Sequence, residues 1–176
     1  MKILVVSDTH RNFSVLDETV KQNLDADVII HLGDGDNEFR DVSNLHPEKA
    51  MVFVGGNCDY GGMHRLSQVV TVSGYKIFCC HGHVQNVAMG LERLVSDAKK
   101  NECKIALYGH THVYRTDKIN DVFVMNPGSL SSPRNGNPPT YGIIELTSTG
   151  EIKMNIVVAG QKAEEQAAGG QNGGAE

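Results

Sequence analysis

The first third of the chain alternates short apolar runs with segments of helical spacing, and this alternation limits the fold more than any other feature of the sequence. Residues 3–6, 28–31 and 51–54 form largely apolar runs of the length of buried strands. Between them, residues 13–23 and 38–45 carry apolar side chains at helical spacing. Strands and helices in this order form parallel sheets with right-handed crossovers. We therefore expect a parallel sheet covered by helices.

The pattern changes after residue 66, where strands begin to follow one another directly. Residues 67–72 and 75–80 are separated by Ser73-Gly74, which is a two-residue hairpin signal. The strongest helical spacing of the chain follows over residues 87–101. Further strands are expected at residues 105–108, 113–119, 122–125, 141–146 and 152–158. A parallel beginning and an antiparallel end fit a mixed α/β domain with two packed sheets and helices outside.

Length and composition favour a single domain over residues 1–160. A chain of 176 residues with 40% hydrophobic content is large enough for one well-packed domain and too short for two ordinary ones. Residues 161–176 are rich in Gly, Ala, Gln and Glu and contain no aliphatic side chain larger than alanine. Such a segment cannot bury enough apolar surface to offset the entropy of ordering, so we expect a disordered tail.

The charge and the cysteines limit the partners and the location. A net charge of −5 and a pI near 5.9 argue against strong nucleic-acid binding, and any phosphate chemistry would have to be led by bound cations. The four cysteines form no C-x-x-C pair, which favours a reduced, cytoplasmic setting. The apolar run before Ser7 is too short for a signal peptide, and no run is long enough for a membrane span. We expect a cytoplasmic protein without a membrane partner.

Side chains that bind metal ions follow nearly every core strand. In open α/β sheets, sites form outside the carboxyl ends of strands, so the loops that carry these side chains should converge. There are seven such side chains, more than one ion normally requires, and two ions that share one carboxylate would use all of them. Because the set lacks thiolate, it favours Mn, Fe, Ni or Zn over a cysteine-rich zinc centre. The seven candidate ligands are Asp8, His10, Asp34, Asn57, His81, His110 and His112.

These ligands belong to short motifs that stand in a fixed order along residues 1 to about 160. The motifs are Asp8-x-His10, Gly33-Asp34, Gly56-Asn57-Cys58-Asp59, His81-Gly82-His83 and Gly109-His110-x-His112. The series resembles the calcineurin-like metallophosphoesterases, and most of all their small, single-domain bacterial and archaeal phosphodiesterases, to which the retromer scaffold subunit of eukaryotes is related. The resemblance implies a four-layer α/β/β/α sandwich with two mixed β-sheets.

The same resemblance implies a phosphoesterase, and most closely a phosphodiesterase that acts on a small phosphodiester. In this family a hydroxide bridged by two divalent metal ions attacks the phosphorus. Manganese is the expected metal, with nickel, iron or zinc as alternatives, and a homodimer is also expected by resemblance. The implied ligands are Asp8, His10, Asp34 and His112 for one ion, and Asp34, Asn57, His81 and His110 for the other, with Asp34 as the bridge.

Three side chains are candidates for contact with the substrate. Asn57 can both ligate a metal and orient the phosphate. His83 can contact phosphate or donate a proton, but a supporting or surface position is equally consistent with the sequence. Arg134 can hold a phosphate oxygen with two hydrogen bonds, or it can be a surface charge.

Cys58 departs from the pattern of the family that the chain resembles. Many relatives carry a histidine there, thought to protonate the leaving oxygen, and a thiol is a poor proton donor at neutral pH. We therefore expect acidic aryl leaving groups to react readily and alkyl leaving groups slowly.

Two other functions stay open at the level of sequence. A phosphomonoesterase needs a basic pocket for a dianion, and none is evident, so a diester fits slightly better. A metal-bound scaffold or sensor of the same fold has no need of a complete ligand set, and all seven ligands are present here, which favours an enzyme.

Three further histidines are expected to play no direct part as ligands. His31 precedes Gly33-Asp34, and we expect it to pack against the site or support it. His46 and His64 lie in polar segments and are expected to be solvated.

Overall fold

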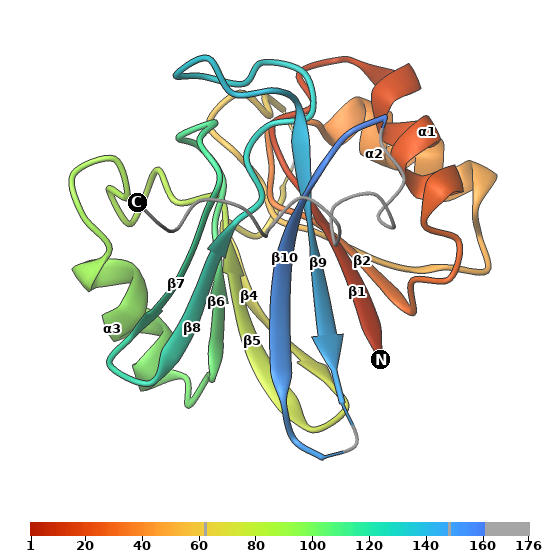
Figure 1. The fold of residues 1–176 in the computed structure, drawn as a ribbon. Coiled ribbons are helices and arrows are strands. Elements are labelled where there is room, and N and C mark those ends of the chain that lie inside the picture. The colour runs from red at the N-terminus through yellow and green to blue at the C-terminus, as the bar shows by residue number, and fades with distance from the viewer. Residues whose placement is uncertain (62, 148, 161–176) are drawn as a thin grey trace, which may run out of the picture.

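Two five-stranded sheets pack against each other in the computed structural model, which describes residues 1–61, 63–147 and 149–160 (Figure 1). The tail expected at residues 161–176 lies outside the described residues, so the domain boundary at residue 160 stays a prediction. None of the helices in the described part of the chain is long and apolar enough to cross a membrane.

The first sheet has the strand order β10-β9-β1-β2-β3. Its parallel part contains β1 (Lys2–Val6), β2 (Val28–His31) and β3 (Ala50–Phe53). Two antiparallel strands, β9 (Thr140–Leu146) and β10 (Ile152–Val158), extend it on the other side of β1. The parallel beginning expected from the alternation of strands and helices is confirmed.

The second sheet has the strand order β4-β5-β6-β8-β7. The hairpin of β4 (Ser67–Val72) and β5 (Tyr75–Cys80) agrees with the expected residues. β5, β6 (Ile105–Leu107) and β8 (Val122–Asn126) run parallel, and β7 (Arg115–Ile119) forms the antiparallel edge. Both sheets are therefore mixed.

Helices cover the outer face of each sheet and complete the four layers. α1 (Phe13–Gln22) and α2 (Asp36–Leu45) lie against the first sheet, and α3 (Glu92–Lys100) lies against the second (Figure 1). The expected α/β/β/α sandwich is confirmed.

β1 is apolar at every position from Ile3 to Val6 because both of its faces are covered. Ile3 and Val5 lie in the core between the two sheets, whereas Leu4 and Val6 pack in the core beneath α1 and α2. All four side chains are fully buried. A strand covered on both faces has no position for an exposed polar side chain, so the usual alternation disappears.

The helix expected at residues 87–101 is shorter than the sequence pattern indicated. It begins at Glu92, and the residues before it form turns. Gly90 lowers helix propensity within the expected range, and Asn86, directly before that range, has a left-handed φ of 56° typical of a turn. Val87 is nevertheless buried against the second sheet, so its apolar character reflects packing within a turn.

Candidate metal centre

The seven candidate ligands converge at one end of the two sheets, in the loops that follow β1, β2, β3, β5 and β6. Three of them, Asp8, His10 and His112, offer ligand atoms that all lie within 4.8 Å of one another. Nε2 of His112 is 3.1 Å from Oδ1 of Asp8 and 3.2 Å from Nε2 of His10. Ligands about 2.1 Å from a common ion are themselves about 3.0–3.4 Å apart, so this spacing suits a metal ion.

A second group lies beside the first and is built around Asp34 and His81. Nε2 of His81 is 3.4 Å from Oδ2 of Asp34 and 3.1 Å from Oδ1 of Asn57. The His110 ring stands 5.2 Å from the His81 ring, centroid to centroid. Oδ2 of Asp34 is also 3.9 Å from Nε2 of His10, so the same carboxylate oxygen faces both groups.

Backbone contacts orient two of the histidines for metal binding. Nδ1 of His81 donates to the carbonyl oxygen of Leu32 at 2.7 Å, and Nδ1 of His112 donates to that of Ser132 at 2.6 Å. A carbonyl only accepts hydrogen bonds, so each Nδ1 carries the proton and each Nε2 keeps a lone pair toward the centre. This arrangement is characteristic of metal-binding histidines.

The carboxylates are poised to face a cation. Oδ1 of Asp8 is buried and has no hydrogen bond among the described residues. Burial alone would raise the pKa of Asp8, but the neighbouring His112 and His81 lower it by a larger amount. The pKa of Asp8 is therefore below its ordinary value, and the carboxylate stays ionised. Burial alone would likewise raise the pKa of Asp34, but the His81 ring beside it and the backbone N–H of Cys58, which donates to its Oδ1 at 2.7 Å, lower that pKa by more. The donor set therefore fits divalent metal ions.

Most of the candidate ligands have a left-handed backbone conformation, which sets the direction of their side chains. Non-glycine residues adopt such conformations at some energetic cost, in turns and at functional sites. The ligands with positive φ are Asp8 (56°), His10 (42°), Asp34 (57°), His110 (68°) and His112 (59°).

Asp59 holds the loop of Asp34, although sequence reasoning gave it no role beyond its place in a motif. Its carboxylate accepts N–H groups from Asp34, Gly35, Asp36 and Gly56 at 2.7 to 3.0 Å. These bonds also satisfy amides at the start of α2, where negative charge is favoured.

Two polar side chains, Asn126 at the end of β8 and Ser129 just after it, were also missed, because the sequence around them predicts only a turn. Asn126 donates to the carbonyl of Gly109 at 2.8 Å, and Ser129 donates to that of Asp8 at 2.7 Å. Both side chains are fully buried. Asn126 holds the backbone next to His110, and Ser129 holds the backbone of Asp8 itself. These two contacts join distant parts of the chain, so only the tertiary structure shows them.

His31 supports the site, as expected. It is fully buried, and its Nδ1 accepts the N–H of Gly33 at 3.1 Å. Its Nε2 therefore donates to the hydroxyl of Thr9 at 2.9 Å, and that hydroxyl donates to Glu38 at 2.6 Å. The chain of bonds joins the loop after β1 to the loop after β2 and to α2.

The expectation that His46 and His64 are solvated is wrong. His64 packs edge-on against Phe53, with ring centroids 5.0 Å apart, and its Nε2 is 3.1 Å from Oδ1 of Asp36. His46 is half-buried, with its Nε2 3.5 Å from Asp17. His64 is held inward by Phe53 and Asp36, and His46 lies next to Asp17, and the local sequence shows none of these tertiary contacts.

The remaining candidates lie at the rim of the centre. His83 is half-buried, with its ring 5.4 Å from that of His81 and 6.2 Å from that of His110. Arg134 is exposed, and its backbone N–H donates to the carbonyl of His112 at 3.1 Å. The Sγ of Cys58 lies within 4.8 Å of ligand atoms of His10 and Asp34.

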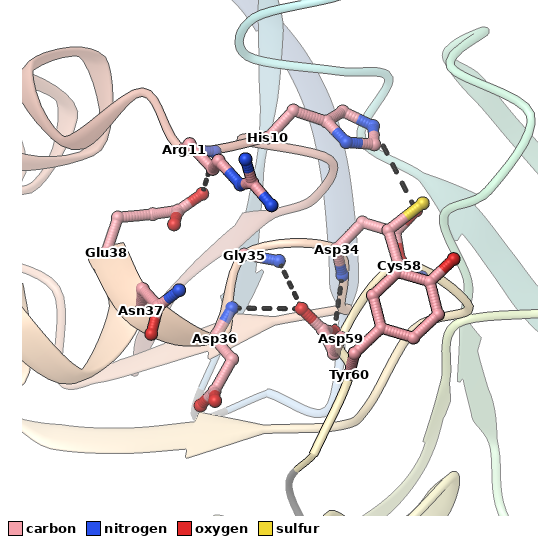
Figure 2. Close-up of a pocket in the computed structure, with 10 residues that line it drawn as sticks. All are labelled: His10, Arg11, Asp34, Gly35, Asp36, Asn37, Glu38, Cys58, Asp59 and Tyr60. Carbon is pink, nitrogen blue, oxygen red and sulfur yellow. Dashed lines mark hydrogen bonds and ion pairs between the residues drawn. The ribbon is translucent and has the colours of Figure 1, made fainter.

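A cavity of about 260 Å³ opens beside the metal ligands (Figure 2). His10, Asp34 and Cys58 line it next to the centre, and Arg11 and Tyr60 form parts of its outer wall. Three further lining residues, Asp36, Glu38 and Asp59, are acidic. This cavity gives a substrate access to the ligand cluster.

Residues 1–149 match the family model described as the calcineurin-like phosphoesterase superfamily domain. The chain belongs to this superfamily. A probable metallophosphoesterase of Bacillus subtilis is 27% identical over 167 residues, which cover 94% of this chain and 96% of that protein. A phosphodiesterase of Methanocaldococcus jannaschii is 29% identical over 164 residues, or 82% of this chain and 93% of the other.

A solved structure supports the same fold. The crystal structure of an uncharacterized, predicted phosphoesterase of Streptococcus pneumoniae aligns with a TM-score of 0.79 at 28% sequence identity. The alignment covers 90% of this chain and 89% of that one. The ligand cluster of this calcineurin-like phosphoesterase therefore stands on a fold that it shares with its relatives.

Proposed function

We propose that the protein is a metal-dependent phosphodiesterase with two divalent ions, manganese in the first place, held by the seven candidate ligands. The observation that carries the proposal is the position of Asp34, whose Oδ2 is 3.4 Å from His81 of one group and 3.9 Å from His10 of the other. When bound, such a pair of ions activates a water and polarises the phosphoryl oxygens as a Lewis acid.

The residues around the centre have separate tasks in this proposal. Asn57 ligates with its amide oxygen and orients the phosphate with its amide nitrogen. In this proposal His83, whose ring is 5.4 Å from that of His81, donates a hydrogen bond to the phosphoryl group, and Arg134 binds a phosphate oxygen from the rim. His81 and His112 keep their Nε2 atoms directed at the centre through their backbone bonds.

The charge of the cavity favours a diester over a monoester. Its lining contains the carboxylates of Asp36, Glu38 and Asp59, and Arg11 is the cation among its lining residues. A phosphodiester carries one negative charge and a monoester nearly two at neutral pH, so the dianion meets more repulsion. The relative in Methanocaldococcus jannaschii is named a phosphodiesterase, in agreement with this preference.

The proposal extends to the setting of the enzyme. The cysteines at positions 58, 79, 80 and 103 are free thiols, which suits a reducing cytoplasm. A homodimer stays a prediction, and light scattering on the purified protein tests it.

The deciding experiment is hydrolysis of bis(p-nitrophenyl) phosphate by chelator-stripped protein with Mn²⁺ added back. We expect turnover that requires the metal and falls at least about 100-fold in Asn57→Ala, because the variant loses a ligand and a phosphate contact. Asn44→Ala, at an exposed position of α2, is the control and keeps the wild-type rate. Stoichiometric metal binding without any turnover contradicts the proposal and favours a sensor or scaffold.

A further inference from the structure

A second cavity, of about 470 Å³, adjoins the one beside the metal centre. It lies between α2 and the segment that follows β3. Asp36, Asn37 and Tyr60 line both cavities, so the two share a wall. The volume is in the range of small-molecule sites, and the shared residues place this cavity next to the one beside the metal ligands.

The floor of this second cavity, which we call the ring cavity, is aromatic. Phe39 and Phe53 lie with their ring centroids 4.9 Å apart at an interplanar angle of 34°, and His64 stands edge-on to Phe53. All three side chains are half-buried and line the cavity, and Tyr60, which is 85% exposed, lies on the side that it shares with the cavity beside the metal centre. Such surfaces bind a flat ring by stacking.

The rim of the ring cavity carries hydrogen-bonding groups of both kinds. Arg40 donates from Nη2 to Oδ1 of Asn37 at 2.8 Å, which uses one of the five N–H donors of its guanidinium. The hydroxyl of Ser43 donates to the backbone carbonyl of Arg40 at 2.9 Å, so its oxygen can still accept. Donors and acceptors around an aromatic floor suit a heteroaromatic ring better than a plain hydrocarbon.

We propose that the ring cavity binds a heteroaromatic ring carried by one ester group of the substrate, so that the preferred substrates are phosphodiesters of nucleosides. The nucleobase lies on Phe39 and Phe53, and the sugar passes Asp36 and Tyr60 toward the phosphate at the metal centre. This inference rests on the proposed phosphodiesterase function and adds the class of substrate to it.

Three diesters with a common leaving group test the inference in the metal-loaded, full-length protein. Methyl, phenyl and thymidine 5′ esters of p-nitrophenyl phosphate all release p-nitrophenolate, so their reactions differ mainly in the group that remains. We expect the KM of the thymidine ester to be about tenfold below that of the methyl ester, since stacking of one base is worth that much or more. The phenyl ester should lie between them.

Two neighbouring positions of α2 provide matched variants. Ser43→Trp fills the ring cavity, and we expect it to bring the ratio of the methyl and thymidine KM values close to one. Asn44→Trp adds the same side chain at an exposed position that does not line the cavity, and it should keep the tenfold ratio. Tyr60→Ala, at an exposed side chain, provides a second variant that leaves the core untouched and should reduce the ratio severalfold.

A binding measurement separates this inference from the proposed function. Calorimetry compares thymidine 5′-monophosphate with methyl phosphate on the Mn²⁺-loaded protein, and we expect the nucleotide to bind about tenfold more tightly except in Ser43→Trp. Ring-selective binding without turnover supports the ring cavity and refutes the phosphodiesterase. Turnover with equal KM values in all three diesters overturns the ring cavity and leaves the phosphodiesterase standing. Neither turnover nor selective binding refutes both.

Discussion

Asp59 contributes to the centre without being a ligand in any of the clusters found among the described residues. Its carboxylate accepts N–H groups from both the Gly33-Asp34 segment and Gly56, and so joins the loop after β2 to the loop after β3. Hydrogen bonds to an ionised acceptor are the stronger kind. The position of Asp34 therefore depends on a residue that does not bind the metal.

Asp59→Asn should weaken Mn²⁺ binding about tenfold or more and lower the free energy of unfolding by about 2 kcal/mol. The amide removes the charge and turns an N–H donor toward backbone N–H groups. Calorimetric titration with Mn²⁺ and urea unfolding measure the two effects. Asp41→Asn, at an exposed position of α2, is the control. Unchanged affinity for Mn²⁺ in Asp59→Asn would show that the loop holds its shape without this carboxylate.

His31 should make stability depend on pH in acid. Burial lowers its pKa from 6.5 to about 4, and the nearby carboxylates of Glu38 and Asp59 reverse this only in part. The folded state keeps the ring neutral, so its contribution is complete above pH 6.5 and is lost as the pH falls toward 4. Between pH 7.5 and 5.0 the wild type should lose about 2 kcal/mol more than His31→Gln. Urea unfolding in chelator measures it, and parallel pH curves for the two proteins would exclude this role.

The thiol of Cys58 should leave the enzyme sensitive to its leaving group. Cys58 is exposed, but partial desolvation at the edge of the centre and the neighbouring carboxylate of Asp34 raise the pKa of this thiol to about 11, so it gives up a proton poorly. We expect aryl phosphodiesters to react at least about 100-fold faster than dialkyl ones, which is the lower range of what general-acid catalysis contributes. Steady-state rates over a series of leaving groups test this, and a flat series would mean that another group supplies the proton.

At the scale of elements, the sequence predicts strands well because most are buried on one or both faces. β2, β4, β5 and β10 agree with the expected residues. The start of α3 at Glu92 was not predictable from spacing alone, because Val87 is apolar for packing in a turn.

The same contrast applies to the centre. The candidate ligands could be predicted from the sequence because each lies in a loop that follows a strand, and binding sites of parallel sheets form at the carboxyl ends of the strands. Ser129 and Asn126 are not readable, because each bonds a backbone carbonyl that the fold brings near, in the case of Ser129 one that is 121 residues away. The strand order β6-β8-β7 was also not predictable from the sequence, because β8 lies between β6 and β7, which both precede it in the chain.

Gly109 joins β6 to the His110 loop, and Gly109→Ala should damage metal binding more than folding. An added Cβ would lie 2.0 Å from Oγ of Ser7 and 2.9 Å from Oδ2 of Asp8, which are themselves hydrogen-bonded. We expect a loss of about 1–3 kcal/mol in stability and at least about tenfold in Mn²⁺ affinity. Gly136→Ala is the control, because its φ of 71° is strained for alanine but its surroundings are open. Equal Mn²⁺ affinities in the two variants would contradict the prediction.

At the scale of the whole molecule, the centre ties the two sheets together. Loops of the first sheet carry Asp8, His10, Asp34 and Asn57, and loops of the second carry His81, His110 and His112. Both sheets already share a core of aliphatic side chains. Metal ions bound between them would therefore add a second attachment at the end of the sandwich where the apolar core stops.

This arrangement predicts that Mn²⁺ stabilises the folded protein as a whole. At a free concentration 100 times the dissociation constant, one site adds about 2.7 kcal/mol, which raises the Tm of a domain of this size by about 5–10 °C. Differential scanning calorimetry with Mn²⁺ and with chelator measures the increment. Asp34→Ala, which removes the carboxylate that faces both groups, should lose most of it. Ile77→Val lies in the core between the sheets and should lower both Tm values equally, by a few degrees. If Mn²⁺ raised the Tm of Asp34→Ala as much as that of the wild type, the stabilising ions would have to bind elsewhere, and the two groups would not form one centre.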